Sequence, residues 1–181
     1  GKVRAELTIP NPALWTPDTP NLYAVECRLY DKHGRLQDEV KEQFGLRWYG
    51  FGEDGMFYLN GKQTKLIGTS RHQCYKGLGN ALPDSLQRRD IMLIKAMGAN
   101  FLRVAHYPQG EYIMHLCDSI GLLCSVEIPL VNAITETEAF AQRCEDMLAE
   151  MVWQNRNHPS VVLWAYSTEI LLRPPFKSDT A

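Results

Sequence analysis

The stretch "SVVLWAYSTEI", from Ser160 to Ile170, decides the fold, because an uninterrupted apolar run ends at a carboxylate. All side chains from Val161 to Ala165 are apolar, which is typical of a strand that is buried on both faces in a parallel sheet. Glu169 follows where the strand gives way to a loop. A purely structural strand has no use for a carboxylate at this point. The stretch therefore predicts a parallel sheet with a functional group at its carboxyl edge.

Three further apolar segments precede this stretch, and helical patterns separate all four. Strands that alternate with helices in this way form a parallel sheet that the helices cover. We therefore predict an α/β fold, and both a doubly wound sheet and a (β/α)8 barrel begin with this alternation. The four predicted strands are "TKLIGTS" (64–70), "NFLRVA" (100–105), "LLCSVEIP" (122–129) and "SVVLWAYS" (160–167).

The three predicted helices show apolar residues at helical spacing and signals at their ends. Gly98 and Gly121 follow the first two helices, where glycine favours a left-handed cap. Thr135 and Glu138 have the spacing of a capping box at the start of the third. The predicted apolar faces are Leu86, Leu93, Ile94 and Met97 in the first helix, Ile113, Leu116, Cys117 and Ile120 in the second, and Phe140, Cys144, Met147, Leu148, Met151 and Val152 in the third.

The region before the alternating pattern predicts antiparallel strands. "YAVECRLY" (23–30) precedes the turn "DKHG" and a returning strand, and Asn60-Gly61 is a preferred turn pair between two apolar runs. So few hairpin strands are too small a sheet to be stable alone. We interpret residues 1–50 as the last part of a β-sandwich and residues 51–181 as the α/β domain.

Composition and charge narrow the function classes. The chain has 181 residues, of which 45% are hydrophobic, and a formal net charge of -2. This charge does not favour nucleic acid or an anionic membrane as a partner. No signal peptide and no membrane-spanning run is recognised, which leaves cytoplasmic and periplasmic locations open. Three of the five cysteines (Cys117, Cys124 and Cys144) lie in apolar patterns and are expected in the core.

Polar residues follow the end of each predicted strand. Because the carboxyl ends of parallel strands share one face of a barrel, these side chains should converge into a site. They are Ser70, Arg71 and His72 after the first strand, Arg103 and His106 at the second, Glu127 at the third, and Thr168 and Glu169 at the fourth.

Each of these residues also has a simpler interpretation. A single histidine such as His72 or His106 is often a hydrogen-bonded loop residue, and Glu127 could be a buried partner of Arg103. His72, His106 and Glu127 have the chemistry of zinc ligands, but no two share one element at ligand spacing, so this signal is weak. No glycine-rich phosphate loop follows the first strand, which disfavours nucleotide binding.

The chain resembles family 2 glycoside hydrolases, which include β-galactosidases, β-glucuronidases and β-mannosidases. The resemblance covers nearly the whole chain. It rests on motifs that occur in the family's order: "NPALWTPDTPNLY", "FGLRWYGF", "FYLNGKQTKLIG", "RHQCYKGLGNALPD", "LIKAMGANFLRVAHYP", "LCDSIGLLCSVEIP" and "NRNHPSVVLWAYSTE".

The resemblance implies an immunoglobulin-like β-sandwich that precedes a (β/α)8 barrel, and a retaining mechanism with two glutamates. Glu169 matches the acid/base glutamate, which protonates the leaving glycosidic oxygen. Arg103 matches an arginine that supports the catalytic carboxylates, and His72 and His106 match histidines that line the sugar subsite. The implied substrate is a β-glycoside, and no cofactor and no metal is implied.

Two further positions match supporting residues, and three depart from the family pattern. Glu127 and Trp164 match residues that support the site from behind. Thr168 replaces an asparagine whose amide binds the sugar 2-hydroxyl, so part of a transition-state interaction is expected to be lost. Ser70 stands where asparagine is common and Cys74 where an acidic residue is common.

The resemblance also implies that the nucleophile follows the seventh strand, whereas only four strands are predicted within these 181 residues. We therefore expect half a barrel that carries the acid/base half of the active site and is inactive alone. Two alternatives stay open: a non-catalytic carbohydrate-binding module, and an interaction protein. Because a half barrel leaves strand edges unpaired, we also expect self-association through them.

Overall fold

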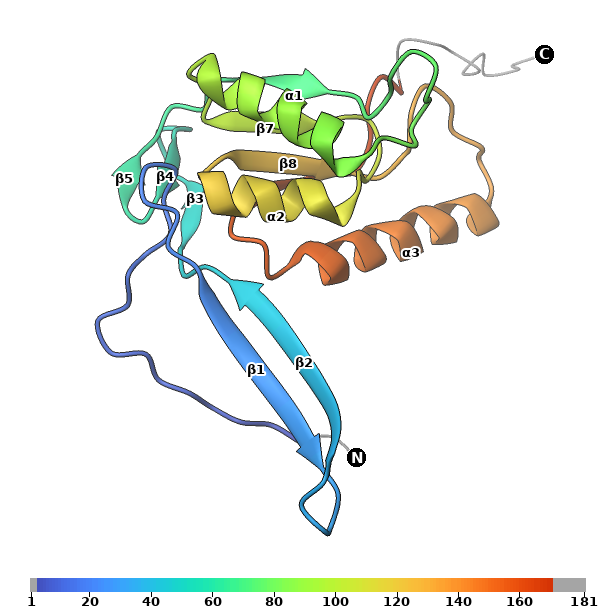
Figure 1. Cartoon of the computed structure of the whole chain (residues 1–181). Helices are drawn as coiled ribbons and strands as arrows, with labels where there is room; N and C mark the ends of the chain where they lie inside the picture. Colours follow the sequence, from blue (N-terminus) through green and yellow to red (C-terminus); the bar gives the residue numbers. More distant parts are fainter. Residues whose placement is uncertain (1–2, 171–181) are drawn as a thin grey trace, which may run out of the picture.

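Four parallel strands form the sheet that the apolar segments predict. The computed structural model describes residues 3–170. The strands lie side by side in the order of the chain, with β7 and β8 in the middle, so all four predicted strands are confirmed (Figure 1). They are β6 (Gly68–Arg71), β7 (Phe101–Val104), β8 (Leu123–Glu127) and β9 (Val161–Ala165).

Three helices pack on the same face of this sheet: α1 (Asp84–Ala96), α2 (Glu111–Ile120) and α3 (Glu138–Asn155) (Figure 1). One hydrophobic cluster joins them to the sheet, with Ile91 from α1, Ile113 from α2 and Cys144 from α3. A doubly wound sheet has helices on both faces, whereas a barrel has them on the outside only. The arrangement is therefore that of the first half of a (β/α)8 barrel, as predicted.

The helix ends confirm two of the three predicted signals. Gly98 and Gly121 both have left-handed backbones, with φ of 87° and 70°. The predicted capping box at Thr135 is wrong by two residues, because α3 begins at Glu138 and Thr137 caps it by accepting a hydrogen bond from the Phe140 amide. The backbone between Thr135 and Thr137 is a short turn instead.

The predicted apolar face of α1 is partly wrong. Leu93 and Met97 are 56% and 70% exposed, whereas the buried residues of α1 are Gln87, Ile91 and Ile94. Gln87 can take a core position because its side-chain amide donates a hydrogen bond to the Leu82 carbonyl oxygen. The prediction counted only apolar residues, so it left out Gln87. The predicted buried face of α1 was therefore rotated about the helix axis from the observed one.

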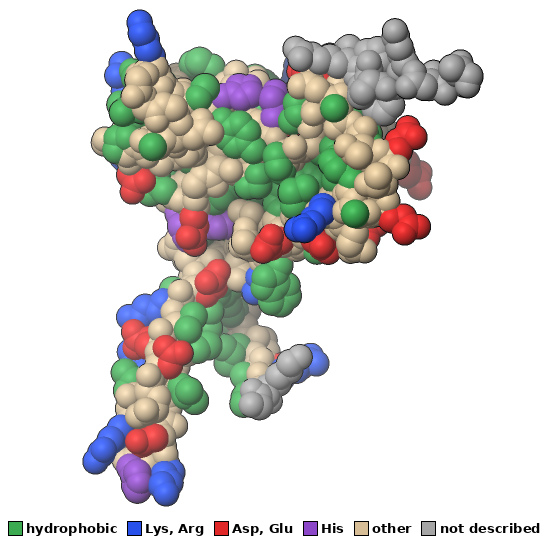
Figure 2. Space-filling view, turned by 90° about the vertical axis from the view of Figure 1, so that its right-hand side faces the viewer, with side chains coloured by type: hydrophobic (Ala, Val, Ile, Leu, Met, Phe, Trp, Pro, Cys, Tyr) green, Lys and Arg blue, Asp and Glu red, His purple; other side chains and the backbone are tan. Residues whose placement is uncertain are grey.

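The amino-terminal strands β1 (Tyr23–Tyr30) and β2 (Leu36–Phe44) form the predicted antiparallel hairpin. The hairpin extends away from the parallel sheet (Figure 1). It carries charged side chains of both signs (Figure 2), among them Arg28, which pairs with Glu26 on the same strand and with Glu39 on the opposite strand. Nearly all its residues are exposed. That the hairpin belongs to a β-sandwich stays a prediction.

A small sheet closes the amino-terminal edge of the parallel strands. It contains β3 (Tyr49–Phe51), β4 (Phe57–Leu59) and β5 (Lys62–Gln63), and the turn at Asn60 and Gly61 has φ of 52° and 79°, which confirms the predicted type I′ hairpin. Between this small sheet and the parallel strands lies one buried hydrophobic cluster: Trp15, Phe57, Leu59, Leu123 and Val162.

Two residues before this sheet anchor the amino-terminal region to the α/β part. Trp15 is fully buried and its indole nitrogen donates to the Asp118 carbonyl oxygen at 2.8 Å. The Arg47 guanidinium donates to the carbonyl oxygens of Pro159, at 3.0 Å, and Val161, at 2.8 Å. Burial lowers the pKa of Arg47 from its ordinary value, but a guanidinium stays charged in proteins.

The predicted core cysteines Cys117, Cys124 and Cys144 are buried, and Cys27 and Cys74 are exposed. A span of about 20 apolar residues is needed to cross a bilayer, and no helix within residues 3–170 meets that requirement.

Candidate active site

Arg103 on β7 brings the predicted site residues together. Its Nη2 atom donates hydrogen bonds to Thr168 Oγ1 at 2.8 Å, and to Glu127 Oε2 at 3.1 Å, and lies 3.0 Å from His106 Nδ1. These partners follow three neighbouring strands, so the carboxyl ends of the strands converge as predicted. We refer to Arg103, His106, Glu127 and Thr168 as the polar cluster.

Arg103 Nη2 has two hydrogens and three close neighbours. Its hydrogen bonds to Thr168 Oγ1 and Glu127 Oε2 use both, so the 3.0 Å contact with His106 Nδ1 is a shared hydrogen bond when Nδ1 is unprotonated. The same Nδ1 atom is 3.6 Å from Glu127 Oε1, a distance that is an ion pair only when Nδ1 is protonated. In either form His106 Nε2 is left for a bound hydroxyl, as a donor or an acceptor.

Glu127 is the buried anion of the polar cluster. Its side chain is 2% exposed, and its Oε1 atom has no hydrogen-bond partner among the described residues. A buried acceptor without a partner costs about 1–3 kcal/mol. The positive charge of Arg103 already occupies the space between Glu127 and His106, which disfavours a metal ion there.

Thr168 and Glu169 lie on a loop that is held to the loop after β8. The Thr168 amide donates to the Leu130 carbonyl oxygen at 3.0 Å, and Thr168 also forms a bridge with Val131. Glu169 has a left-handed backbone with φ of 57°. The other non-glycine residues of positive φ in the described chain are asparagines, which tolerate this conformation, so Glu169 stands apart. Such strain of a non-glycine residue is frequent at functional sites.

The environment of Glu169 differs from the expectation. A carboxyl that is partly shielded from water would suit a proton donor, but Glu169 is exposed. The four described strands form only one wall around it.

Of the remaining predicted residues, His72 and Ser70 lie next to members of the polar cluster, whereas Cys74 and Trp164 do not contact it by a hydrogen bond. The His72 ring packs against His106 with 4.7 Å between ring centroids. Ser70 pairs with Arg103 in the register of β6 and β7, and Cys74 is exposed. Trp164 packs against the hydrophobic cluster beneath the helices and makes no hydrogen bond with the polar cluster.

A second arginine network was not predicted in detail. Arg71, at the end of β6, is buried and donates to Asp90 Oδ2 on α1 and to Gln109 Oε1. The Gln109 amide in turn donates to the carbonyl oxygens of Arg71 and Ala105. This network positions the loop that leads from β7 to α2 and carries His106. The sequence did show a charged residue, Arg71, at the end of a predicted buried strand. Its partners Asp90 and Gln109 could not be predicted, because they are distant in sequence.

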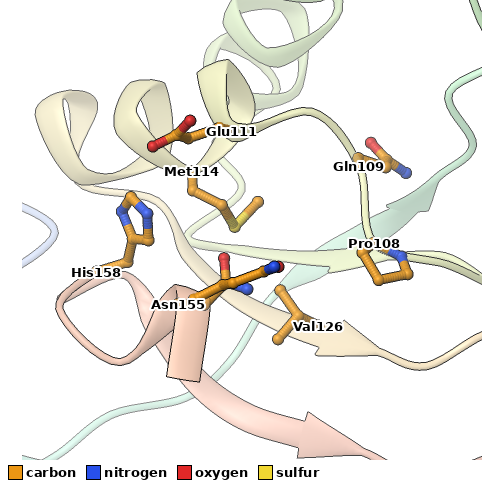
Figure 3. Close-up of a pocket in the computed structure, with 8 residues that line it drawn as sticks. Pro108, Gln109, Glu111, Met114, Val126, Asn155 and His158 are labelled. Atoms are coloured by element: carbon orange, nitrogen blue, oxygen red, sulfur yellow. The ribbon is translucent and has the colours of Figure 1, made fainter. Parts of the chain in front are cut away.

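One cavity of the described chain lies away from the polar cluster. It has a volume of about 380 Å³ and opens between α2 and α3, on the face of the sheet that the helices cover (Figure 3). The residues that line it are Pro108, Gln109, Glu111, Met114, Val126, Gln154, Asn155 and His158.

Comparison with known proteins places this geometry in a family. The chain is 45% identical to a β-glucuronidase of Bacteroides uniformis, with a TM-score of 0.84 over 89% of this chain and 19% of that structure. It is 43% identical to B. uniformis β-glucuronidase 2, with a TM-score of 0.85 over 93% of this chain and 20% of that one. It is also 38% identical to a β-galactosidase of Thermoanaerobacter pseudethanolicus over 88% of this chain and 21% of that protein.

The chain therefore spans about a fifth of the length of these relatives. Two family models match it. Residues 1–47 match the model of glycosyl hydrolases family 2, and residues 53–178 match the TIM barrel domain of the same family. The second match covers most of the chain and includes the whole polar cluster. This chain belongs to glycosyl hydrolases family 2.

Proposed function

We propose that this chain provides the acid/base half of the active site of a retaining β-glycosidase, with Glu169 as the proton donor. The observation that carries the proposal is the convergence of His106, Glu127 and Thr168 on one guanidinium nitrogen of Arg103. Glu169 directly follows Thr168, so the polar cluster fixes the loop from which this carboxyl extends.

The chemistry assigns a separate task to each group. The Glu169 carboxyl gives its proton to the glycosidic oxygen as the bond from that oxygen to the anomeric carbon breaks. The polar cluster offers His106 Nε2 to a sugar hydroxyl, while the buried Glu127 carboxylate holds Arg103 in place. A retaining enzyme needs a second carboxylate about 5 Å from the first, to form the glycosyl-enzyme intermediate. By the family resemblance, that group follows the seventh strand of the complete barrel.

We infer that the substrate is a terminal β-linked sugar, a glucuronide or a galactoside. The relatives named above are β-glucuronidases and a β-galactosidase. One of them, B. uniformis β-glucuronidase 2, is covalently bound to cyclophellitol-6-carboxylate aziridine, which supports a covalent mechanism and a carboxylated sugar. The positive charge of Arg103 is already paired with Glu127, so the polar cluster alone does not select a uronic acid.

The test of Glu169 is its replacement by glutamine in a full-length enzyme reconstructed around this chain. Glu169→Gln should retain turnover of nitrophenyl glycosides, whose leaving groups need little protonation, and should lose turnover of alkyl glycosides. Glu136→Gln, at an exposed loop position, is a matched control that should leave both substrates unaffected. Equal loss for both substrate classes would contradict a proton-donor role.

The 181-residue chain alone should not hydrolyse nitrophenyl β-glycosides, because proton donation without a nucleophile forms no intermediate. The measurement is turnover by the purified chain. Hydrolysis that disappears in Glu169→Gln would contradict the need for a second carboxylate from elsewhere.

A carbohydrate-binding module without catalysis is the second candidate. It is favoured by Thr168, whose hydroxyl oxygen is already engaged as an acceptor for Arg103 and replaces the amide of the family motif. The two candidates differ in the full-length protein. A binding module would bind a β-glycoside in calorimetry without turning it over, whereas the enzyme would also release the sugar.

A further inference from the structure

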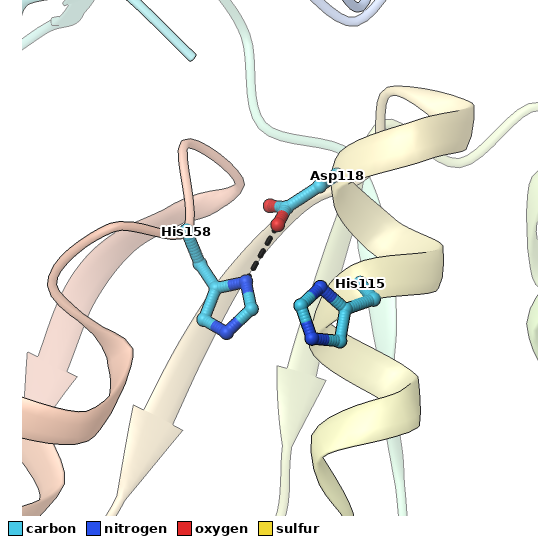
Figure 4. A group of neighbouring side chains, drawn as sticks. All are labelled: His115, Asp118 and His158. Atoms are coloured by element: carbon cyan, nitrogen blue, oxygen red, sulfur yellow. Dashed lines mark hydrogen bonds and ion pairs between the residues drawn. The ribbon is translucent and has the colours of Figure 1, made fainter. Parts of the chain in front are cut away.

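A second group of ionisable side chains lies outside the polar cluster, where α2 meets the segment that leads into β9. His115 and Asp118 are on α2, and His158 precedes β9 (Figure 4). One ligand atom from each lies within 4.8 Å of the others. None of these residues has a part in the proposed glycosidase chemistry.

Asp118 orients the His158 ring. The Asp118 side chain is 2% exposed, and its Oδ2 atom is 2.5 Å from His158 Nδ1. Its other oxygen, Oδ1, accepts hydrogen bonds from the amide and the hydroxyl of Ser160. A carboxylate only accepts, so His158 Nδ1 carries the proton and the lone pair of a neutral ring lies on Nε2. This pairing of a carboxylate with a histidine is the usual support of a metal-binding imidazole.

His115 packs against the His158 ring, and Glu111 contacts His115. The His115 and His158 rings meet edge to face, with 4.9 Å between centroids. His115 Nε2 is 3.4 Å from Glu111 Oε1, one helical turn earlier on α2. Glu111 and His158 both line the cavity of about 380 Å³, which has room for water ligands (Figure 3).

We propose that His115, His158 and Glu111 form a binding site for a divalent transition metal ion of the zinc class, with Asp118 as the residue that positions His158. Two imidazoles and one carboxylate suit zinc, cobalt or nickel rather than magnesium or calcium, which prefer oxygen ligands alone. Water from the cavity completes the coordination.

The exposed ligands must turn to reach one ion. Metal–nitrogen bonds of about 2.0–2.1 Å place two ligating nitrogens roughly 3–4 Å apart. The limit of 4.8 Å holds for one atom each of His115, Asp118 and His158, and Glu111 joins them through its 3.4 Å contact with His115 Nε2. The His115 side chain is 46% exposed and the Glu111 side chain 82% exposed, so both can turn toward His158, which Asp118 keeps fixed.

The hydrogen bonds from Asp118 to His158 and Ser160 have a structural role of their own, because they join α2 to the start of β9. These hydrogen bonds do not involve His115, so they do not explain why its exposed ring packs against His158. A metal ion would add a second cross-link between the same two segments. Because it binds the folded chain, it should also raise the temperature of unfolding.

The experiment is a titration of the 181-residue chain with CoCl₂ and ZnCl₂, in a Cys27→Ser, Cys74→Ser background that removes the exposed thiols. We expect one Co²⁺ per chain with visible absorption bands, displacement by Zn²⁺, and a higher unfolding temperature with Zn²⁺. His115→Ala should weaken binding by about tenfold or more, and Glu111→Gln by about tenfold. Both residues are exposed, so both variants should fold.

Two matched controls locate the site. His33→Ala removes an exposed histidine of the β1–β2 turn, and His72→Ala removes the histidine that packs against His106. Neither substitution should change the affinity of the chain for Co²⁺ or Zn²⁺. The proposal is overturned if the background chain binds no metal in calorimetry, if His115→Ala binds as tightly as the background chain, or if His72→Ala abolishes binding.

Discussion

At the scale of single residues, Thr168 is the position where this site departs most from the motif of its family. Its hydroxyl oxygen accepts a hydrogen bond from Arg103, and its amide is fixed to Leu130. An asparagine at this position would have an oxygen for Arg103 and an amide group that could donate to a sugar hydroxyl. Threonine provides the first contact without the second.

We therefore expect Thr168→Asn to raise kcat in the reconstructed full-length enzyme, by about tenfold, which corresponds to ~1.4 kcal/mol. The effect should be larger on kcat than on KM, because the contact with the 2-hydroxyl strengthens in the transition state. Thr168→Val, which removes the acceptor for Arg103, should lower kcat. Steady-state kinetics would decide. An unchanged or lower kcat in Thr168→Asn would indicate that threonine is adapted to its own substrate.

The cysteines should differ sharply in reactivity. Cys27 and Cys74 are exposed, whereas a hydrogen bond with Cys124, together with burial, raises the pKa of the Cys117 thiol well above its ordinary value. A raised pKa keeps the thiol protonated to higher pH, and only the thiolate reacts. We expect an aromatic disulfide reagent to modify two thiols quickly in the native chain and the other three only after unfolding. Rapid modification of all five would contradict the packed core.

At the scale of elements, the left-handed glycines that end α1 and α2 have the same backbone and different surroundings. A Cβ atom on Gly98 would meet nothing within 4 Å, whereas one on Gly121 would collide with the backbone of Pro17. Gly121 therefore has two reasons to be glycine, and Gly98 has one.

Gly98→Ala should lower the free energy of unfolding by about 1–2 kcal/mol, the cost of a left-handed alanine. Gly121→Ala should cost about 1–3 kcal/mol more, because the Pro17 backbone must move. Chemical denaturation of the two variants measures the difference. Equal losses would show that the segment around Pro17 does not pack against the end of α2 in solution.

Several elements could be predicted from the sequence because their signals are local. The apolar runs of β6 to β9 and the glycines after α1 and α2 depend on a few neighbouring residues, and they are confirmed. The buried face of α1 was mispredicted, since Gln87 is buried only because the Leu82 carbonyl accepts its hydrogen bond. The convergence on Arg103 could be predicted from strand order, but the donor and acceptor atoms could not. Likewise, the partners Asp118 and His158 are forty residues apart.

At the scale of the whole molecule, the described sheet has two outer strands, β6 and β9, each paired on one side only within residues 3–170. Its inner face carries the polar cluster, and Leu93 of α1 and Met97, which directly follows α1, are exposed on the outside. Both the unpaired edges and the exposed apolar side chains favour association.

We expect the 181-residue chain to self-associate through the edges of the sheet, so its apparent mass in sedimentation velocity should rise with concentration. The double variant Leu93→Lys, Met97→Lys separates the two surfaces. It should still associate if the strand edges are responsible. A monodisperse monomer of the unmodified chain would contradict the prediction, and so would loss of association in the double variant.

The contacts of Arg47 and Trp15 have a consequence for how such proteins can recombine. Both residues belong to the segment that matches the first family model, yet they bind the backbone at the ends of α2 and β9. A crossover between residues 47 and 53 that joined this barrel segment to a foreign sandwich would leave the carbonyl oxygens of Pro159, Val161 and Asp118 without these donors unless the incoming module carried the same two side chains. The sandwich and the barrel should therefore be inherited together, and functional hybrids should be found mainly among donors that keep this tryptophan and this arginine.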